Sequence, residues 1–136
     1  GCGDDEFRRV FDEVLAPLLD RFQPRLILVS AGYDGHFQDP LASMSLSVAG
    51  YGELMAFLKE KAEQYCDGKL VATLEGGYHL LAEAWSIRAS LEVLMGDAVA
   101  ADPFGKSQHA AAPQIDKVLA AVKALHGIKE LAPKGD

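Results

Sequence analysis

Two short loops contain the side chains of this sequence that could do chemistry. The first spans residues 30–42 (SAGYDGHFQDPLA) and contains Asp34, and the second spans residues 74–80 (LEGGYHL) and contains Tyr78. A carboxylate is a hard oxygen ligand for zinc or a similar divalent ion, and a phenol can stabilise an oxyanion that forms beside that ion. Gly76 and Gly77 would let a substrate approach the backbone closely.

Each of these residues also has a purely structural explanation. Asp34 could be a turn or capping residue, Tyr78 could anchor the next helix, and Gly76-Gly77 could form a tight turn from strand to helix. His36 is expected to be solvated, because a single histidine in a loop usually is. Asp39-Pro40 is expected to end the first loop as a simple turn.

The helices around the loops can be placed by the spacing of apolar residues. A first helix is predicted at residues 7–22, and Pro17 should kink or break it because proline removes a backbone donor. Ser47 can cap a second helix that Asp67-Gly68 can end, and Gly96 can end a third. Beyond it, the chain should form a surface linker at 97–113, a C-terminal helix at 114–127 and a tail at 128–136.

The strands should form a parallel sheet. Continuous apolar runs at residues 26–29 and 69–74 predict strands covered on both faces, and the alternation of helix and strand predicts a three-layer αβα fold. Ligands bind at the carboxyl ends of such strands, so Asp34 and Tyr78 should face one cleft. Two strands are too few for a stable parallel sheet, so the chain is expected to be part of a larger domain.

The composition excludes some kinds of partner. The chain has 136 residues, 49% of them hydrophobic, which suffices for one globular core. Its 13 basic and 20 acidic side chains give a net charge of -7, which would repel nucleic acid. No apolar run approaches the roughly 20 residues of a membrane span. Cys2 and Cys66 have no CxxC spacing, and so few cysteines predict a reduced, cytoplasmic protein.

Taken together, the two loops resemble the zinc-dependent histone deacetylase family. The similarity is to the branch that includes bacterial deacetylase-like amidohydrolases, acetylpolyamine amidohydrolases and acetoin-utilisation proteins. It covers residues 1 to 96, and it is specific because both motifs occur in the family's order, each at the end of a strand. The resemblance implies an arginase/deacetylase-like fold, of which this chain would be the C-terminal part.

The resemblance also implies a role for each candidate residue. Asp34 would be a zinc ligand, and Tyr78 would be the catalytic residue that hydrogen-bonds the carbonyl oxygen of the substrate. Gly76 and Gly77 would line the acyl-lysine channel, and Leu41 would belong to its wall. The implied reaction is hydrolysis of an acetyl amide, with acetyl-lysine, an acetylpolyamine or a small acetyl amide as substrate.

The family's remaining catalytic residues have no counterpart in this sequence. Its paired histidines and its aspartate-x-histidine zinc ligands lie upstream of the motif that contains Asp34, and none precedes it here. A catalytic zinc normally has three protein ligands, so this chain should be inactive alone and should need the N-terminal half of the same domain.

Two alternatives remain. One is a small module that binds an anion at the Gly76-Gly77 turn, although Glu75 would repel an anion there. The other is an arginase-like relative with two metals. The Gly-Gly-Tyr motif argues against the second, as does the lack of metal-spaced aspartates beyond Asp34 and Asp39.

Overall fold

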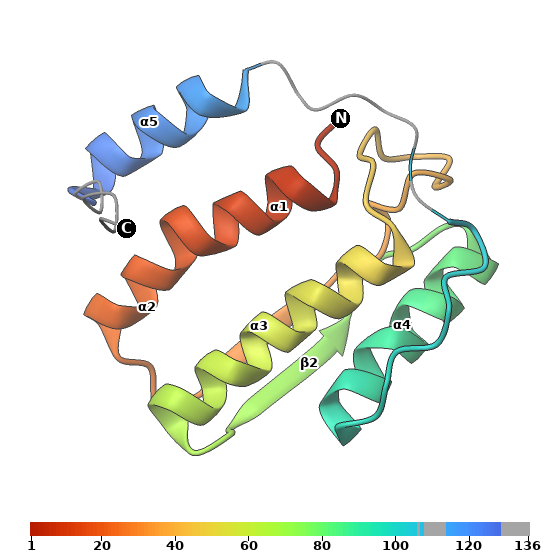
Figure 1. Ribbon diagram of the computed structural model, residues 1–136, viewed down its shortest axis with the longest axis horizontal. Helices are drawn as coiled ribbons and strands as arrows, with labels where there is room; N and C mark the ends of the chain where they lie inside the picture. Colours follow the sequence, from red (N-terminus) through yellow and green to blue (C-terminus); the bar gives the residue numbers. More distant parts are fainter. Residues whose placement is uncertain (106, 108–113, 129–136) are drawn as a thin grey trace, which may run out of the picture.

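The computed structural model describes residues 1–105, 107 and 114–128. These residues form a mixed α/β fold with six helical segments and two strands (Figure 1). In chain order these elements are α1 (Asp4–Val10), the π-helical turn η1 (Phe11–Leu15), α2 (Ala16–Phe22), β1 (Ile27–Ala31), α3 (Val48–Cys66), β2 (Leu70–Leu74), α4 (Leu80–Met95) and α5 (Ile115–His126). The predicted alternation of helices and strands is confirmed.

The two strands lie side by side and parallel. Their register pairs Ile27 with Leu70 and continues to Ala31 with Leu74. The strand predicted at residues 26–29 begins one residue later and runs on to Ala31. Because the strands are parallel neighbours, their carboxyl ends meet at one edge of the sheet, and the loops after Ala31 and Leu74 leave from the same place.

The first helix contains the irregularity that Pro17 predicts. The chain continues from α1 through η1 into α2, and the N–H of Ala16 donates to the carbonyl of Phe11, five residues earlier. Pro17 lies in the first turn of α2, where its missing N–H leaves the helical hydrogen bonding incomplete. The wider π turn accommodates this defect, so the helix is distorted without being broken.

The predicted helix ends are also confirmed. The Ser47 hydroxyl accepts the N–H of Gly50 at 3.0 Å and so caps α3. At the other end of α3, Asp67 adopts a left-handed conformation with φ 52°. Gly96 ends α4 in the same region, with φ 85°. These signals are local in the sequence, which is why they predict boundaries well.

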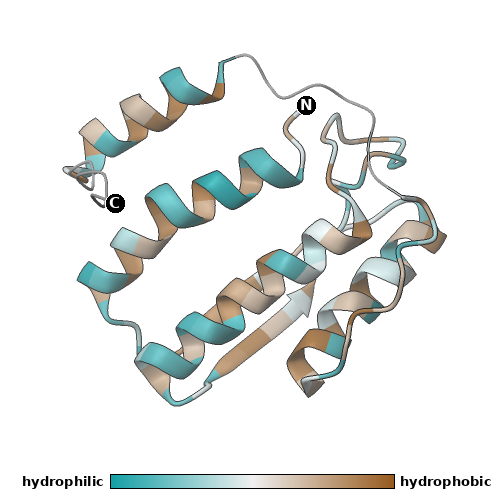
Figure 2. Cartoon of the chain, viewed as in Figure 1, coloured by the Kyte–Doolittle hydropathy of each residue, from teal (hydrophilic) through white to brown (hydrophobic). Residues whose placement is uncertain are grey.

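Helices cover one face of the sheet. α3 and α4 lie side by side (Figure 1), and Ile27 packs with Ala62 and Cys66 of α3. On the opposite face the paired residues Leu28 and Val71 are 71% and 49% exposed. The expectation that both faces are covered is therefore not met by the described part of this chain: side chains alternate along a strand, and only one set meets a helix. The exposed strand β2 nevertheless consists mostly of apolar residues (Figure 2).

The C-terminal helix α5 packs beside the first helix. Leu119 is buried, Lys123 forms an ion pair with Glu13 of η1, and Asp116 accepts a hydrogen bond from Arg9 at 2.8 Å. The prediction of a helix at 114–127 is confirmed. Of the predicted linker and tail, residues 106, 108–113 and 129–136 lie outside the described residues. None of the helices in the described ranges has the length and apolarity needed to cross a membrane.

Candidate functional site

Backbone hydrogen bonds join the two candidate loops. The N–H of Tyr33 donates to the carbonyl of Gly76 at 2.6 Å, and the N–H of Glu75 donates to the carbonyl of Ala31 at 3.1 Å. These contacts continue the pairing of β1 and β2 beyond the strands. The loops that carry Asp34 and Tyr78 therefore leave the sheet as a connected pair.

Asp34 and Tyr78 approach a common point at Gly76. A Cβ atom added to Gly76 would lie 3.5 Å from Oδ1 of Asp34 and 3.8 Å from Cε2 of Tyr78. The carboxylate and the phenol ring thus both lie next to a residue that has no side chain. Tyr78 is 55% exposed and Asp34 is partly exposed, so a ligand could reach both groups.

Two glycines are required by the geometry around this point. A Cβ at Gly32 would approach Oδ1 of Asp34 to 2.9 Å, closer than real Cβ contacts. Gly77 has a φ of 153°, and its Cβ would lie 2.8 Å from Cγ of Glu83. Larger residues at either position would move the carboxylate of Asp34 or the start of α4.

Asp39 does more than end a turn, which is a correction to the sequence interpretation. Its side chain is 8% exposed, and its Oδ2 accepts the N–H of Tyr78 at 2.8 Å. Oδ1 accepts the N–H groups of Leu41 at 2.8 Å and Ala42 at 3.2 Å. Burial alone would raise the pKa of Asp39, but the backbone N–H groups of Leu41, Tyr78, Ala42 and His79 together lower this pKa below its usual value.

Leu41, the residue predicted to line a channel wall, is 70% exposed beside this carboxylate. Because Leu41 and Tyr78 both donate to Asp39, the structure brings them to the same side chain from different loops. No pattern in the sequence indicates this contact, since an Asp-Pro pair in a loop is normally explained by the turn itself.

His36 is not solvated, contrary to the sequence prediction. Its side chain is fully buried, stacks on Phe37 with ring centroids 4.5 Å apart and meets Phe104 at 5.1 Å. Its Nδ1 accepts the N–H of Gln38 at 3.2 Å, and burial is the largest of the effects that lower the pKa of His36. His36 therefore packs inside the loop instead of facing a ligand.

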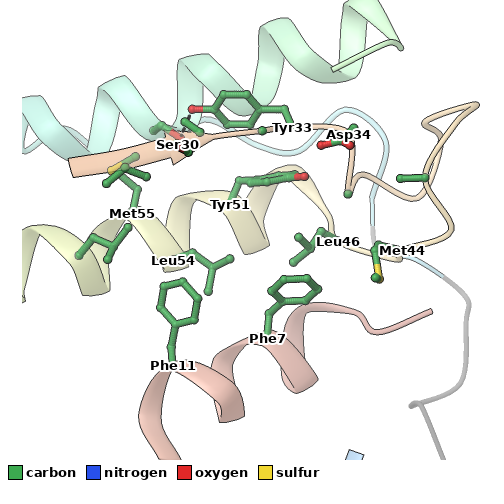
Figure 3. Close-up of a pocket in the computed structure, with 17 residues that line it drawn as sticks. Phe7, Phe11, Ser30, Tyr33, Asp34, Met44, Leu46, Tyr51, Leu54 and Met55 are labelled. Atoms are coloured by element: carbon green, nitrogen blue, oxygen red, sulfur yellow. Dashed lines mark hydrogen bonds between the residues drawn. The ribbon is translucent and has the colours of Figure 1, made fainter. Parts of the chain in front are cut away.

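A cavity of about 410 Å³ lies behind Asp34, between β1, α3 and the first helix (Figure 3). Phe7 and Phe11 close it on one side and Tyr51 on the other. The buried Tyr51 hydroxyl has no hydrogen-bond partner among the described residues, and burial, followed by the charge of Asp34, raises its pKa. Asp34 lines this cavity, and the other predicted site residues, Leu41, Gly76, Gly77 and Tyr78, do not.

The described residues could supply part of a metal site. They contain no group of three or more histidine, cysteine, aspartate or glutamate side chains placed to hold a metal ion. Asp34 has the oxygen chemistry of a zinc ligand, and Gly32 and Gly76 leave space beside its carboxylate. The arrangement fits one ligand of a larger set. Asp39 instead uses both of its oxygens to accept backbone N–H groups of the two loops.

The anion-binding alternative finds no support at the start of α4. The N–H of Tyr78 is already bound by Asp39, and the N–H of Ala82 donates to Nδ1 of His79 at 3.2 Å. Glu83 lies against Gly77 and adds negative charge. Two of the backbone donors near this turn are therefore already in use, and the neighbouring carboxylate would repel an anion.

Comparison with known proteins gives a consistent set of similarities. Residues 1–94 match the histone deacetylase domain. The chain is 47% identical over 78 residues to a "Probable deacetylase" of Archaeoglobus fulgidus, covering 57% of this chain and 22% of that protein. It is 42% identical over 104 residues to "Histone deacetylase 14, chloroplastic" of Arabidopsis thaliana, covering 76% and 25%. A "Histone deacetylase-like amidohydrolase" of Pseudomonas aeruginosa is 37% identical over 78 residues, covering 57% and 20%.

Two solved structures share the fold. The HDA15 HD domain superposes with a TM-score of 0.75 at 28% identity, covering 92% of this chain and 31% of that chain. The histone deacetylase Clr3 superposes with a TM-score of 0.79 at 26% identity, covering 99% and 23%. The chain thus spans between 20% and 25% of the three relatives and less than a third of either structure.

Proposed function

This chain belongs to the histone deacetylase family, and we propose that it forms the C-terminal part of a zinc-dependent deacetylase domain that hydrolyses an acetyl amide. The observation that carries the proposal is the approach of Asp34 and Tyr78 to one point at the carboxyl edge of the sheet. This is where an α/β fold binds its ligands.

In the proposed mechanism Asp34 is one zinc ligand, and zinc in such a site acts as a Lewis acid toward the acyl group. Tyr78 donates a hydrogen bond from its hydroxyl to the acetyl carbonyl oxygen as negative charge develops there. The braced loop backbone keeps the phenol in place before the reaction, so little reorganisation is needed in the transition state.

The proposed substrate channel passes Gly76, Gly77 and the exposed side chain of Leu41. Without side chains at the two glycines, an extended aliphatic amine can lie against the backbone. Acetyl-lysine, acetylpolyamines and small acetyl amides share this chemistry, and all three are candidate substrates.

The proposed partner of this chain is the rest of the same domain. It would supply the remaining zinc ligands and the groups that move protons, and it would cover the exposed pair Leu28 and Val71 on the open face of the sheet. This proposal is supported by the small share of each relative that the chain spans. We expect the 136-residue chain to be inactive alone and the complete protein to be cytoplasmic.

The test is acetate release by the complete protein, loaded with zinc and offered an acetyl-lysine peptide, an acetylpolyamine and a small acetyl amide in parallel. We expect hydrolysis of at least one substrate, loss of activity on chelation, and recovery when zinc is added back. A zinc-loaded, folded protein that releases acetate from none of the three would contradict the proposal.

A further inference from the structure

The carboxylate of Asp39 connects the two loops of the site. It is buried and accepts three backbone hydrogen bonds: Oδ2 accepts from Tyr78, while Oδ1 accepts from Leu41 and Ala42. The N–H of His79 is a fourth backbone group that acts on it. Tyr78 lies 39 residues further along the chain, so the contact joins separate loops and is not part of one turn.

We propose that Asp39 is a positioning residue of the deacetylase reaction, which holds the backbone of Tyr78 so that its hydroxyl meets the acetyl carbonyl oxygen. This inference rests on the proposed function, because it assumes that Tyr78 is the oxyanion donor. It adds a residue that does not touch the substrate and acts through Tyr78.

The surroundings of Tyr78 explain why such a brace is needed. Its side chain is 55% exposed, so packing restrains it weakly. Gly76 and Gly77 precede it, and glycine gives the backbone its greatest freedom. The carbonyl of Gly76, the first glycine, accepts the N–H of Tyr33. The N–H of Tyr78, the residue after the second glycine, donates to Asp39. The two contacts fix the flexible pair from both sides.

The position requires a carboxylate, because each oxygen must accept. Asparagine has nearly the same shape, but only its oxygen can accept a hydrogen bond. Its NH₂ group is a donor and would face a backbone N–H, which is also a donor. The Asp39→Asn variant must therefore lose either the bond from Tyr78 or those from Leu41 and Ala42. Either loss frees one loop relative to the other.

The experiment is a double-mutant cycle in the complete, zinc-loaded protein, with the variants Asp39→Asn, Tyr78→Phe and their combination. We expect Asp39→Asn to lower kcat by about 10- to 100-fold, as small misplacements of a catalytic group do, with a smaller effect on KM. In the Tyr78→Phe background the same change should lower kcat by no more than about twofold, because residues that act together are not additive.

Asp102 provides a matched control. Its carboxylate also accepts three backbone N–H groups, from Ala49 at 3.3 Å, Phe104 at 2.8 Å and Gly105 at 3.1 Å. None of them belongs to the two loops, which Asp102 reaches only indirectly, through the ring of Phe104 on His36 and His79. We expect Asp102→Asn to keep kcat within about twofold of the parent. Zinc content should be equal in all variants, since none of them alters Asp34.

The outcomes separate the inference from the proposed function. If Tyr78→Phe is impaired but Asp39→Asn keeps full turnover, or if the two losses multiply, the positioning role is wrong and the deacetylase assignment stands. If Tyr78→Phe keeps full turnover, the proposed role of Tyr78 fails and the role of Asp39 fails with it. Should Asp39→Asn be insoluble, the cycle is run with Asp39→Glu, which retains a carboxylate; a smaller loss with the same non-additivity supports the inference, and multiplying losses contradict it.

Discussion

Tyr33 donates its backbone N–H to the carbonyl oxygen of Gly76 at 2.6 Å, and this bond places the loop after β1 against the loop after β2. Tyr33 directly precedes Asp34, and Gly76 lies two residues before Tyr78. The parallel register of the strands and the backbone bonds beyond them therefore set the relative position of the two loops, and the bond from Tyr78 to Asp39 connects them again further on.

Replacing Tyr78 by phenylalanine should remove the oxyanion donor and leave the fold intact. Loss of one such donor typically lowers turnover by about 100- to 1,000-fold, and we expect this range for kcat in the complete protein. Tyr65, near the C-terminal end of α3, is the control: its hydroxyl contacts Asp20 of α2, and Tyr65→Phe should keep normal turnover. Undiminished turnover of Tyr78→Phe would show that the phenol has no catalytic role.

Replacing Asp34 by alanine should lower the zinc content of the purified protein. Partners that only support a metal ligand cost about 10- to 100-fold in affinity when removed, so loss of a ligand itself should cost at least as much. Elemental analysis and zinc titration give the measurement. Asp67→Asn, at an exposed carboxylate that ends α3, should bind zinc normally. Equal zinc affinity in Asp34→Ala and the parent would refute the ligand assignment.

The Gly32→Ala substitution tests the space around Asp34 while the aspartate itself is kept. Its methyl group would lie 2.9 Å from Oδ1 of Asp34, so the carboxylate must shift. We expect zinc affinity to fall by about tenfold, as for other changes that reorient a ligand. Zinc titration of the complete protein measures the effect, and unaltered affinity would mean that Asp34 binds no metal in this orientation.

Gly52 provides the control for this substitution. It lies inside α3, and an added Cβ would meet Val99 Cγ2 at 3.5 Å, an ordinary contact. Because alanine has a higher helix propensity than glycine, Gly52→Ala should raise the free energy of unfolding by about 0.5–1 kcal/mol and leave zinc affinity unchanged. Denaturant unfolding of the same protein gives the measurement.

The elements that the sequence predicted correctly depend on neighbours in the chain. Ser47 caps α3 through an N–H three residues away, and the π turn before Pro17 follows from a missing donor within the same helix. The loop positions of Asp34 and Tyr78 follow from two apolar runs, separated by a helix, that pair as parallel strands. These features are fixed by local physics, which a single sequence contains.

The features that the sequence did not predict depend on distant contacts. Asp39 connects the two loops because it accepts the N–H of Tyr78, which lies in the other loop. His36 is buried in part by Phe104, which was predicted to lie in a surface linker. The exposure of Leu28 depends on what covers the second face of the sheet, and no described residue of this chain does. No periodicity or motif indicates contacts of this kind.

The attachment of α5 to η1 should depend on pH. Glu13 forms ion pairs with Lys123 of α5 and with Arg9 at 2.9 Å. The hydrogen bond from Lys123, followed by that from Arg9, lowers the pKa of Glu13 below its usual value. A carboxylate with a lower pKa in the folded state stabilises that state fully above its unfolded pKa, about 4.3, and loses this contribution as the pH falls through the folded pKa.

Hydrogen exchange of the α5 amides, corrected for intrinsic rates, measures this effect. At pH 7 the Glu13→Gln variant should exchange faster than the parent, because the glutamine cannot form an ion pair with Lys123. As the pH falls below about 4.3, the parent should lose protection until both proteins exchange alike. Asp12→Asn removes a solvent-exposed pair with Arg8 at 3.8 Å, and it should change little at either pH. Equal protection of parent and Glu13→Gln at pH 7 would mean that the ion pairs of Glu13 do not hold α5 in place, which would leave that role to the buried Leu119 and the Arg9–Asp116 pair.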